Sequence, residues 1–127
     1  MKSRGFTIIE IVIVLLFVSL SSVLFFTQKS NYDATARDEQ RKTTINTIHY
    51  SLEEGFLKQY GYYPESISET NLPTVDPALW TDPNGTLFGT PGSNYTYEPA
   101  SCYQGRCEEY TLKAVLEKES AYIKTNK

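Results

Sequence analysis

The hydrophobic residues of the 127-residue chain are concentrated in one stretch near its N-terminus. This stretch runs from Phe6 to Phe26, and its 21 residues read FTIIEIVIVLLFVSLSSVLFF. A helix that crosses a bilayer needs about 20 mostly apolar residues, because each residue adds roughly 1.5 Å and the hydrocarbon core is about 30 Å thick. The pattern therefore predicts a transmembrane helix over residues 6–26.

The next region, residues 27–60, contains no proline and predicts that the helix continues beyond the apolar stretch until Gly61. Apolar side chains recur there every three or four residues, at Ile45, Ile48, Leu52 and Phe56. This spacing places them on one helix face, which we expect to pack against the rest of the protein. The charged side chains that we expect on the other sides are Arg41, Lys42, Glu53 and Lys58.

Residues 61–93 hold five of the six prolines and predict a long loop with little regular structure. Its irregularly spaced apolar residues, which we expect to attach it to the helix and sheet, are Ile67, Leu72, Leu79, Trp80, Leu87 and Phe88. Oxygen ligands for calcium are available within residues 76–84, from Asp76, Asp82 and Asn84, but without the spacing of an EF-hand. We favour turn-forming roles for them and leave calcium binding open.

Two segments near the C-terminus, residues 94–98 and 109–117, alternate apolar and polar residues and predict a pair of antiparallel strands. Cys102 and Cys107 lie between them, and a lone cysteine pair in a small exported domain indicates a disulfide more often than a metal site. His49 is the single histidine, so the usual four ligands of a zinc site are missing. The predicted fold class is α+β, with a long N-terminal helix, transmembrane and then amphipathic, on a small antiparallel sheet.

The charged residues of the chain bear on two questions: whether it binds nucleic acid, and which side of the membrane each terminus faces. A net charge of −3 provides no basic field for duplex nucleic acid, so contact with nucleic acid is possible but unsupported. Lys2 and Arg4 precede the apolar stretch and predict that the N-terminus stays in the cytoplasm while the C-terminal part lies outside. We expect no enzyme and no cofactor, because the sequence shows no nucleophile–base pair, metal cluster or cofactor loop.

Glu10 is the unusual residue of the apolar stretch, since a charged side chain at mid-bilayer costs about 2.5 to 3.5 kcal/mol. It belongs to the sequence Arg4-Gly5-Phe6-Thr7-Ile8-Ile9-Glu10, followed by an unbroken apolar run. This segment resembles the signal of type IV prepilins and pseudopilins. The alternative is a plain signal anchor in which the glutamate has no role.

The resemblance implies that a prepilin peptidase cuts between Gly5 and Phe6, that Phe6 becomes N-methylated, and that residues 1–5 are a leader peptide. It also implies that Glu10 acts in assembly. The new amine would have a pKa of about 7.7 to 8 and would be a cation near Glu10, on the same helix face as Phe6. Many pilins carry a helix-bending proline where this chain has Thr27, so we expect no proline-marked kink.

The resemblance further implies a structural subunit of a type IV pilus or related filament, with residues 61–127 forming the globular part of the pilin domain. Its partners would be copies of itself, other pilins, the peptidase, and a membrane assembly platform with a motor ATPase. It would begin as a single-pass cytoplasmic membrane protein and end in an extracellular pilus.

The main alternative is a minor or tip pilin, or a pseudopilin, that serves adhesion, DNA uptake or secretion. Exposed tyrosines that would bind a ligand in that role are Tyr62, Tyr63, Tyr95, Tyr97 and Tyr103. The sequence leaves open whether the subunit is major or minor, which of these processes it serves, and the symmetry of the filament.

Overall fold

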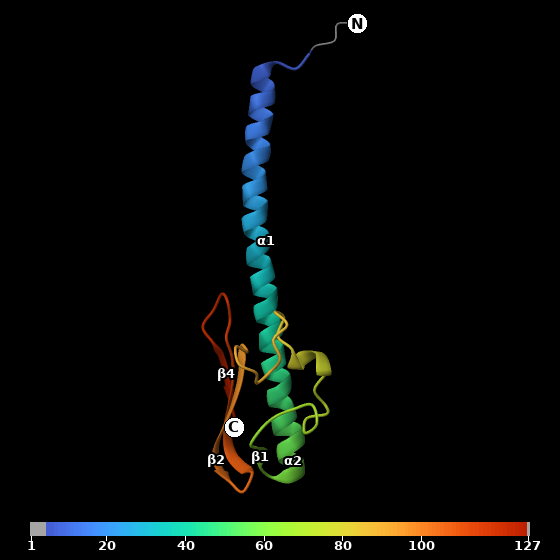
Figure 1. The fold of residues 1–127 in the computed structure, drawn as a ribbon, viewed down its shortest axis with the longest axis vertical. Coiled ribbons are helices and arrows are strands. Elements are labelled where there is room, and N and C mark those ends of the chain that lie inside the picture. Colours follow the sequence, from blue (N-terminus) through green and yellow to red (C-terminus); the bar gives the residue numbers. More distant parts are fainter. Residues whose placement is uncertain (1–4, 127) are drawn as a thin grey trace. The chain divides into compact units, whose positions relative to one another are not determined.

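The computed structural model describes residues 5–126, and its first element is a long run of helix. Helix α1 spans Ile8–Tyr50, a π-helical segment η1 spans Ser51–Phe56, and α2 spans Leu57–Tyr60 (Figure 1). The run ends where predicted, because Gly61 adopts the left-handed conformation with φ 78° and donates its N–H to the carbonyl of Leu57. The π-helical segment was not predicted.

The chain divides into two compact units, of which the first ends at Ala34 and the second begins at Thr35. The second unit contains a four-stranded antiparallel sheet, and the helix together with this sheet gives the predicted α+β fold. No proline interrupts α1, which is α-helical throughout its length.

The sheet is built around its third strand. Strands β2 (Tyr95–Tyr103) and β3 (Arg106–Ala114) form the predicted antiparallel hairpin, with Tyr95 opposite Ala114 and Cys102 opposite Cys107. The other edge of β3 pairs with β1 (Tyr63–Pro64) at one end and β4 (Tyr122–Thr125) at the other. These two short strands were not predicted, because two to four residues carry too little alternation.

The hairpin turn has an evident local cause. Gln104 and Gly105 occupy its two central positions with φ angles of 51° and 79°. Two positive φ values in a two-residue turn match the twist of the flanking strands. The cysteines therefore stand directly opposite each other, where a disulfide joins them, as predicted.

The core lies between one face of the helix and the sheet. The predicted apolar stripe supplies the helix side chains of this core. Ile45, Ile48 and Leu52 are fully buried, and Phe56 packs at the margin. Most of the loop residues named above join them, including Leu72 and Trp80. Leu87 does not: it is 52% exposed and its backbone forms an isolated bridge with Thr81.

Two predictions of exposed side chains are wrong. Arg41 and Glu53, expected on the outer sides of the helix, are both buried, because polar partners from other segments cover them. Among the tyrosines expected at the surface, Tyr63 and Tyr95 are buried in the core. Their rings supply the packing area that a small sheet needs.

Candidate functional site

The start of α1 is the first candidate site. The carbonyl of Thr7 accepts hydrogen bonds from the N–H groups of Glu10 at 3.0 Å and Ile11 at 3.2 Å, so the helix begins at Ile8. Threonine is favoured directly before a helix, and threonine followed three residues later by glutamate has the spacing of a capping box. Glu10 also lies in the first turn, where the helix dipole favours negative charge. The helix terminus thus provides a local reason for this carboxylate.

Gly5 and Phe6 lie before the helix in a segment without regular structure. Both residues are exposed, and the Phe6 side chain has 76% of its surface accessible. In this uncut chain the helix begins two residues after Phe6, so the shared helix face of Phe6 and Glu10 that we expect after cleavage stays a prediction. Lys2 and Arg4 lie outside the described residues. The peptide bond between Gly5 and Phe6 is open to approach.

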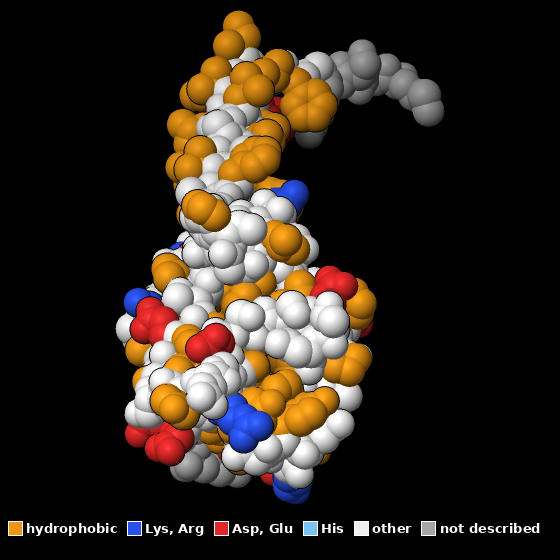
Figure 2. Space-filling view, turned by 60° about the horizontal axis from the view of Figure 1, so that its bottom comes forward, with side chains coloured by type: hydrophobic (Ala, Val, Ile, Leu, Met, Phe, Trp, Pro, Cys, Tyr) orange, Lys and Arg blue, Asp and Glu red, His pale blue; other side chains and the backbone are white. Residues whose placement is uncertain are grey.

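The apolar stretch of α1 exposes its side chains on every side. Its large hydrophobic residues from Ile8 to Phe26 are each between 49% and 82% exposed. Figure 2 shows hydrophobic side chains gathered along this part of the helix. With a mean hydropathy of 2.8 over 18 residues, the helix is long and apolar enough to cross a membrane, by length and composition. Nothing in its own unit covers this surface.

The hydroxyl groups within the stretch are satisfied inside the helix. Ser19 donates to the carbonyl of Leu16 at 2.9 Å, while Ser21 and Ser22 each donate at 2.8 Å to a carbonyl four residues earlier. A polar group facing hydrocarbon must find such a partner, because lipid offers none. These serines therefore add little cost to membrane insertion.

The second candidate site is a buried charge cluster around Arg41, in the second unit. The Arg41 guanidinium, 1% exposed, forms a two-bond ion pair with Asp82 at 2.7 and 3.1 Å. It also donates to Asp38 at 3.1 Å and to Glu117 at 2.9 Å. Asp38 in turn accepts the backbone N–H groups of Glu117 and Lys118. One arginine thereby joins the helix, the loop and the segment after β3.

The electrostatics of this cluster favour the ionised forms. Burial disfavours the Asp82 carboxylate, but hydrogen bonds from Arg41, the Asn84 N–H and the Asn94 amide outweigh burial and lower its pKa. The pKa of Glu117 falls to about 2, chiefly because Arg37 donates two hydrogen bonds to it and Arg41 a further one. At neutral pH these carboxylates stay ionised and hold the cluster together.

A second buried polar group surrounds Glu53 in the π-helical segment. One carboxylate oxygen of Glu53 accepts from the hydroxyls of Tyr63 at 2.9 Å and Tyr110 at 2.8 Å. The Tyr110 hydroxyl also lies 2.7 Å from His49 Nδ1. Burial, followed by the hydrogen bond to Glu53, raises the pKa of Tyr63 to about 12, so its hydroxyl keeps its proton. The group links helix to sheet, and His49 contributes to it through the Tyr110 hydroxyl.

The candidate calcium ligands have turn-forming positions, as favoured from the sequence. Asp76 accepts from the N–H of Ala78 and caps the short helix η2 (Pro77–Trp80). Asp82 accepts from the N–H of Asn84 at 3.0 Å, from the Asn94 amide and from two nitrogens of Arg41. Within residues 5–126, no three His, Cys, Asp or Glu side chains are grouped to hold a metal ion.

Sequence reasoning predicted the disulfide, which the structure contains, but missed the Arg41 cluster. The roles of Gly5, Phe6 and Glu10 stay predictions. The available signal was the spacing of Asp38 and Arg41, three residues apart on one helix face. Asp82 and Glu117 lie 41 and 76 residues from Arg41, and no local pattern joins them. Comparison with protein-family models, with curated proteins and with solved structures finds no match to this chain.

Proposed function

We propose that this protein is a structural subunit of a type IV pilus or a related filament. In this proposal the subunit is inserted in the cytoplasmic membrane through residues 6–26, cut between Gly5 and Phe6, and polymerised through its apolar helix. The peptidase, a membrane assembly platform and a motor ATPase supply processing and energy, and the mature subunit ends in a filament outside the cell.

The observation that carries the proposal is the combination at the start of α1. An exposed Gly5–Phe6 bond precedes a helix whose apolar side chains are exposed on all sides, and a lone carboxylate, Glu10, lies in its first turn. A membrane covers such a surface before assembly, and the apolar helices of neighbouring subunits cover it afterwards. Either environment excludes water from Glu10 and creates a need for a positive partner.

Cleavage supplies that partner. It removes Lys2 and Arg4 and leaves the amine of Phe6, which is largely cationic at neutral pH because its pKa is about 7.7 to 8. In the uncut chain Phe6 precedes the helix rather than lying on the Glu10 face. The amine can pair with Glu10 of the same subunit or, as the resemblance to pilins implies, with Glu10 of its neighbour.

The second unit fits the role of a durable outer domain. The Cys102–Cys107 disulfide closes the hairpin, and the Arg41 cluster ties the helix to two distant segments. A disulfide also suits the oxidising side of the membrane. The second unit lies on that side in this proposal, because Lys2 and Arg4 keep the N-terminus in the cytoplasm.

Two substitutions of Glu10 test the proposal in the native host. Glu10→Gln keeps the side-chain shape and the capping-box pattern but removes the charge, whereas Glu10→Val removes both. If the charge pair drives assembly, both variants insert normally, and sheared filament falls by roughly tenfold or more, equivalent to about 1.4 kcal/mol. Filament is measured by immunoblot of the sheared, sedimented fraction.

Ser21→Val is the matched control, because it also replaces an exposed polar residue of the apolar stretch. It should leave the filament yield unchanged. A normal yield from Glu10→Gln would show that Glu10 acts only in helix capping and would remove the proposed role of its charge.

A further inference from the structure

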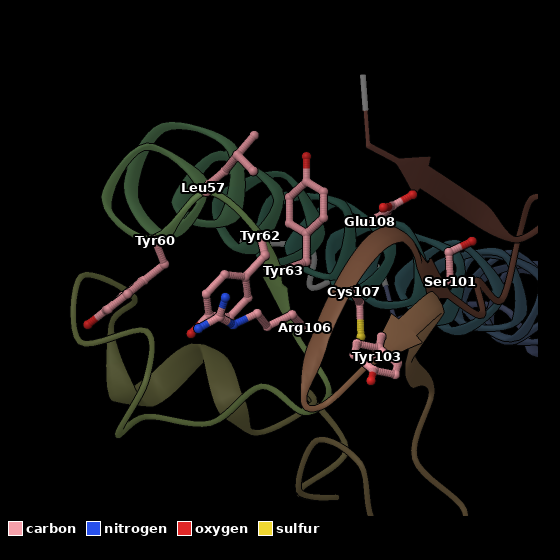
Figure 3. Close-up of a pocket in the computed structure, with 10 residues that line it drawn as sticks. Leu57, Tyr60, Tyr62, Tyr63, Ser101, Tyr103, Arg106, Cys107 and Glu108 are labelled. Atoms are coloured by element: carbon pink, nitrogen blue, oxygen red, sulfur yellow. The ribbon is translucent and has the colours of Figure 1, made fainter.

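A cavity of about 490 Å³ opens in the second unit between the end of the helix and the β2–β3 hairpin. Figure 3 shows Tyr60 and Tyr62 on the helical side and Tyr103 and Arg106 on the hairpin. Cys107 of the disulfide, which is buried, lies at the base of the hairpin side. The pairing of Tyr63 in β1 with Cys107 in β3 ties the segment after the helix to the hairpin.

The walls expose flat aromatic surface. Tyr103 is 76% exposed and Tyr60 is 51% exposed, although both are large rings in a unit that buries Tyr63 and Tyr95. The rings of Tyr60 and Tyr62 have their centroids 6.1 Å apart and are tilted by 48° to each other. Aromatic rings with a polar tip suit ligands that have both an apolar face and hydroxyl groups.

Arg106 provides the charge of the cavity. Its guanidinium lies over the Tyr62 ring, with the carbon 5.1 Å from the ring centroid (Figure 3). Within the part of the chain that the structure describes, Arg106 forms no ion pair, unlike Arg37 and Arg41. A guanidinium stacked on a ring keeps its planar edge free for a carboxylate or phosphate. The arginine is thus held in place without being neutralised.

We propose that this cavity binds an acidic saccharide, with the carboxylate of a uronic or similar sugar acid on Arg106 and the pyranose ring against Tyr103 or Tyr60. A pyranose ring has an apolar C–H face for the tyrosine rings and hydroxyl groups for the polar rim, which includes Ser101 and Glu108. A single cation matches one carboxylate per sugar ring. The volume is within the range of small-molecule sites.

The cavity fits two other anionic ligands less well. Single-stranded nucleic acid needs a groove of several cations along its backbone, whereas Arg106 is the one cation among the described residues that line this cavity, and the whole chain has a net charge of −3. An acidic peptide would gain affinity by adding to a free strand edge. At Arg106 and Cys107, however, β3 is paired on both sides, by β1 and by β2, so a peptide added to the outer edge of β2 would not run beside Arg106.

The inference does not rest on the proposed filament, because the described residues that line the cavity all belong to the second unit. The test uses the purified full-length chain in detergent micelles and two probes, methyl glucuronide and methyl glucoside. These probes share one ring and differ in whether it carries a carboxylate. Binding is measured by NMR titration.

The expected dissociation constant for methyl glucuronide is on the order of 1 mM, a weak affinity that suits a single sugar ring. Methyl glucoside should bind about tenfold more weakly. Arg106→Gln should abolish this difference, and Tyr103→Ala should weaken both sugars. Lys124→Gln is the matched control, because it removes a cation stacked on Tyr122 outside the cavity, and it should change neither affinity.

Three results would overturn the proposal. They are equal binding of the two sugars by the unaltered chain, an undiminished preference for the glucuronide in Arg106→Gln, and tighter binding of an oligonucleotide or an acetylated glutamate peptide at the same residues. Thermal unfolding of each variant shows whether its fold is intact, and Arg106→Lys, which keeps the charge, should retain part of the preference. None of these results depends on whether filaments form.

Discussion

The apolar stretch of α1 and the second unit differ in which side chains they bury. In residues 8–26 the large hydrophobic side chains are exposed and the lone carboxylate lies at the helix start. In the second unit hydrophobic side chains form a core, and an arginine and two aspartates are buried beside it. The first region is long and apolar enough to cross a membrane, whereas the second buries its apolar side chains within its own core.

The largest effect is expected in the second unit, from Arg41→Met. The variant leaves Asp38 and Asp82 buried without their cation, and breaking a buried pair costs about 3–5 kcal/mol of unfolding free energy. Chemical denaturation of the full chain in micelles measures this. Arg37→Met, at a half-exposed pair with Glu117, is the control and should cost at most about 1 kcal/mol. Equal losses of unfolding free energy in the two variants would show that the burial of the Arg41 ion pairs does not increase their contribution to stability.

A charged residue placed in the apolar stretch should change the free energy of membrane insertion by a comparable amount. Leu16→Arg should make membrane insertion less favourable by about 3 kcal/mol, while the denaturation midpoint of the second unit stays unchanged. Leu87→Arg is the matched control, because Leu87 is similarly exposed, at 52% against 60%, but lies in the second unit. Unimpaired insertion of Leu16→Arg in a membrane-integration assay would argue against a transmembrane role.

A smaller loss is expected from Cys102→Ser. Closing so short a loop restricts the unfolded chain by only about 2 kcal/mol, which sets the expected decrease in unfolding free energy. Cleavage after Gly5 should be unaffected. Thermal unfolding under oxidising conditions provides the measurement, and an unchanged midpoint would show that the disulfide does not stabilise the unit.

The smallest effect on stability is expected when the pH is lowered. The pKa values of Asp82 and Glu117 lie below their ordinary values of 3.8 and 4.5, so the unfolded chain binds more protons as the pH falls. Their stabilisation is therefore full above about pH 5 and is lost as the pH falls through the folded values, toward about 2 for Glu117. The melting temperature of the parent should decrease over this range, and that of Arg41→Met should decrease less. Lys58→Met, at an exposed pair, should follow the parent.

The sequence predicted features that depend on neighbours along the chain. The apolar stretch, the Ile45–Leu52 stripe, the end of the helix at Gly61 and the β2–β3 hairpin each have a local period or a special residue. A hydrophobic period or a glycine at a left-handed position acts within a few residues, so one sequence is enough to recognise it.

The features that the sequence did not predict depend on distant partners. Arginine on a helix usually faces solvent. The burial of Arg41 becomes favourable only because Asp82 and Glu117 accept hydrogen bonds from its guanidinium. Glu53 is similar, because its acceptor oxygen is satisfied by Tyr63 and Tyr110. Tyrosine has both an apolar ring and a hydroxyl, so composition alone does not separate the buried Tyr63 from the exposed Tyr103.

The proposed assembly of this chain through its apolar helix is tested most directly by mass spectrometry of its N-terminal peptide. The peptide is taken from membranes and from sheared, sedimented surface material of the native host. The account predicts an N-methylated peptide that begins at Phe6 in the sheared fraction. An intact N-terminus at Met1, found only in membranes, would contradict it and would leave a signal-anchored domain.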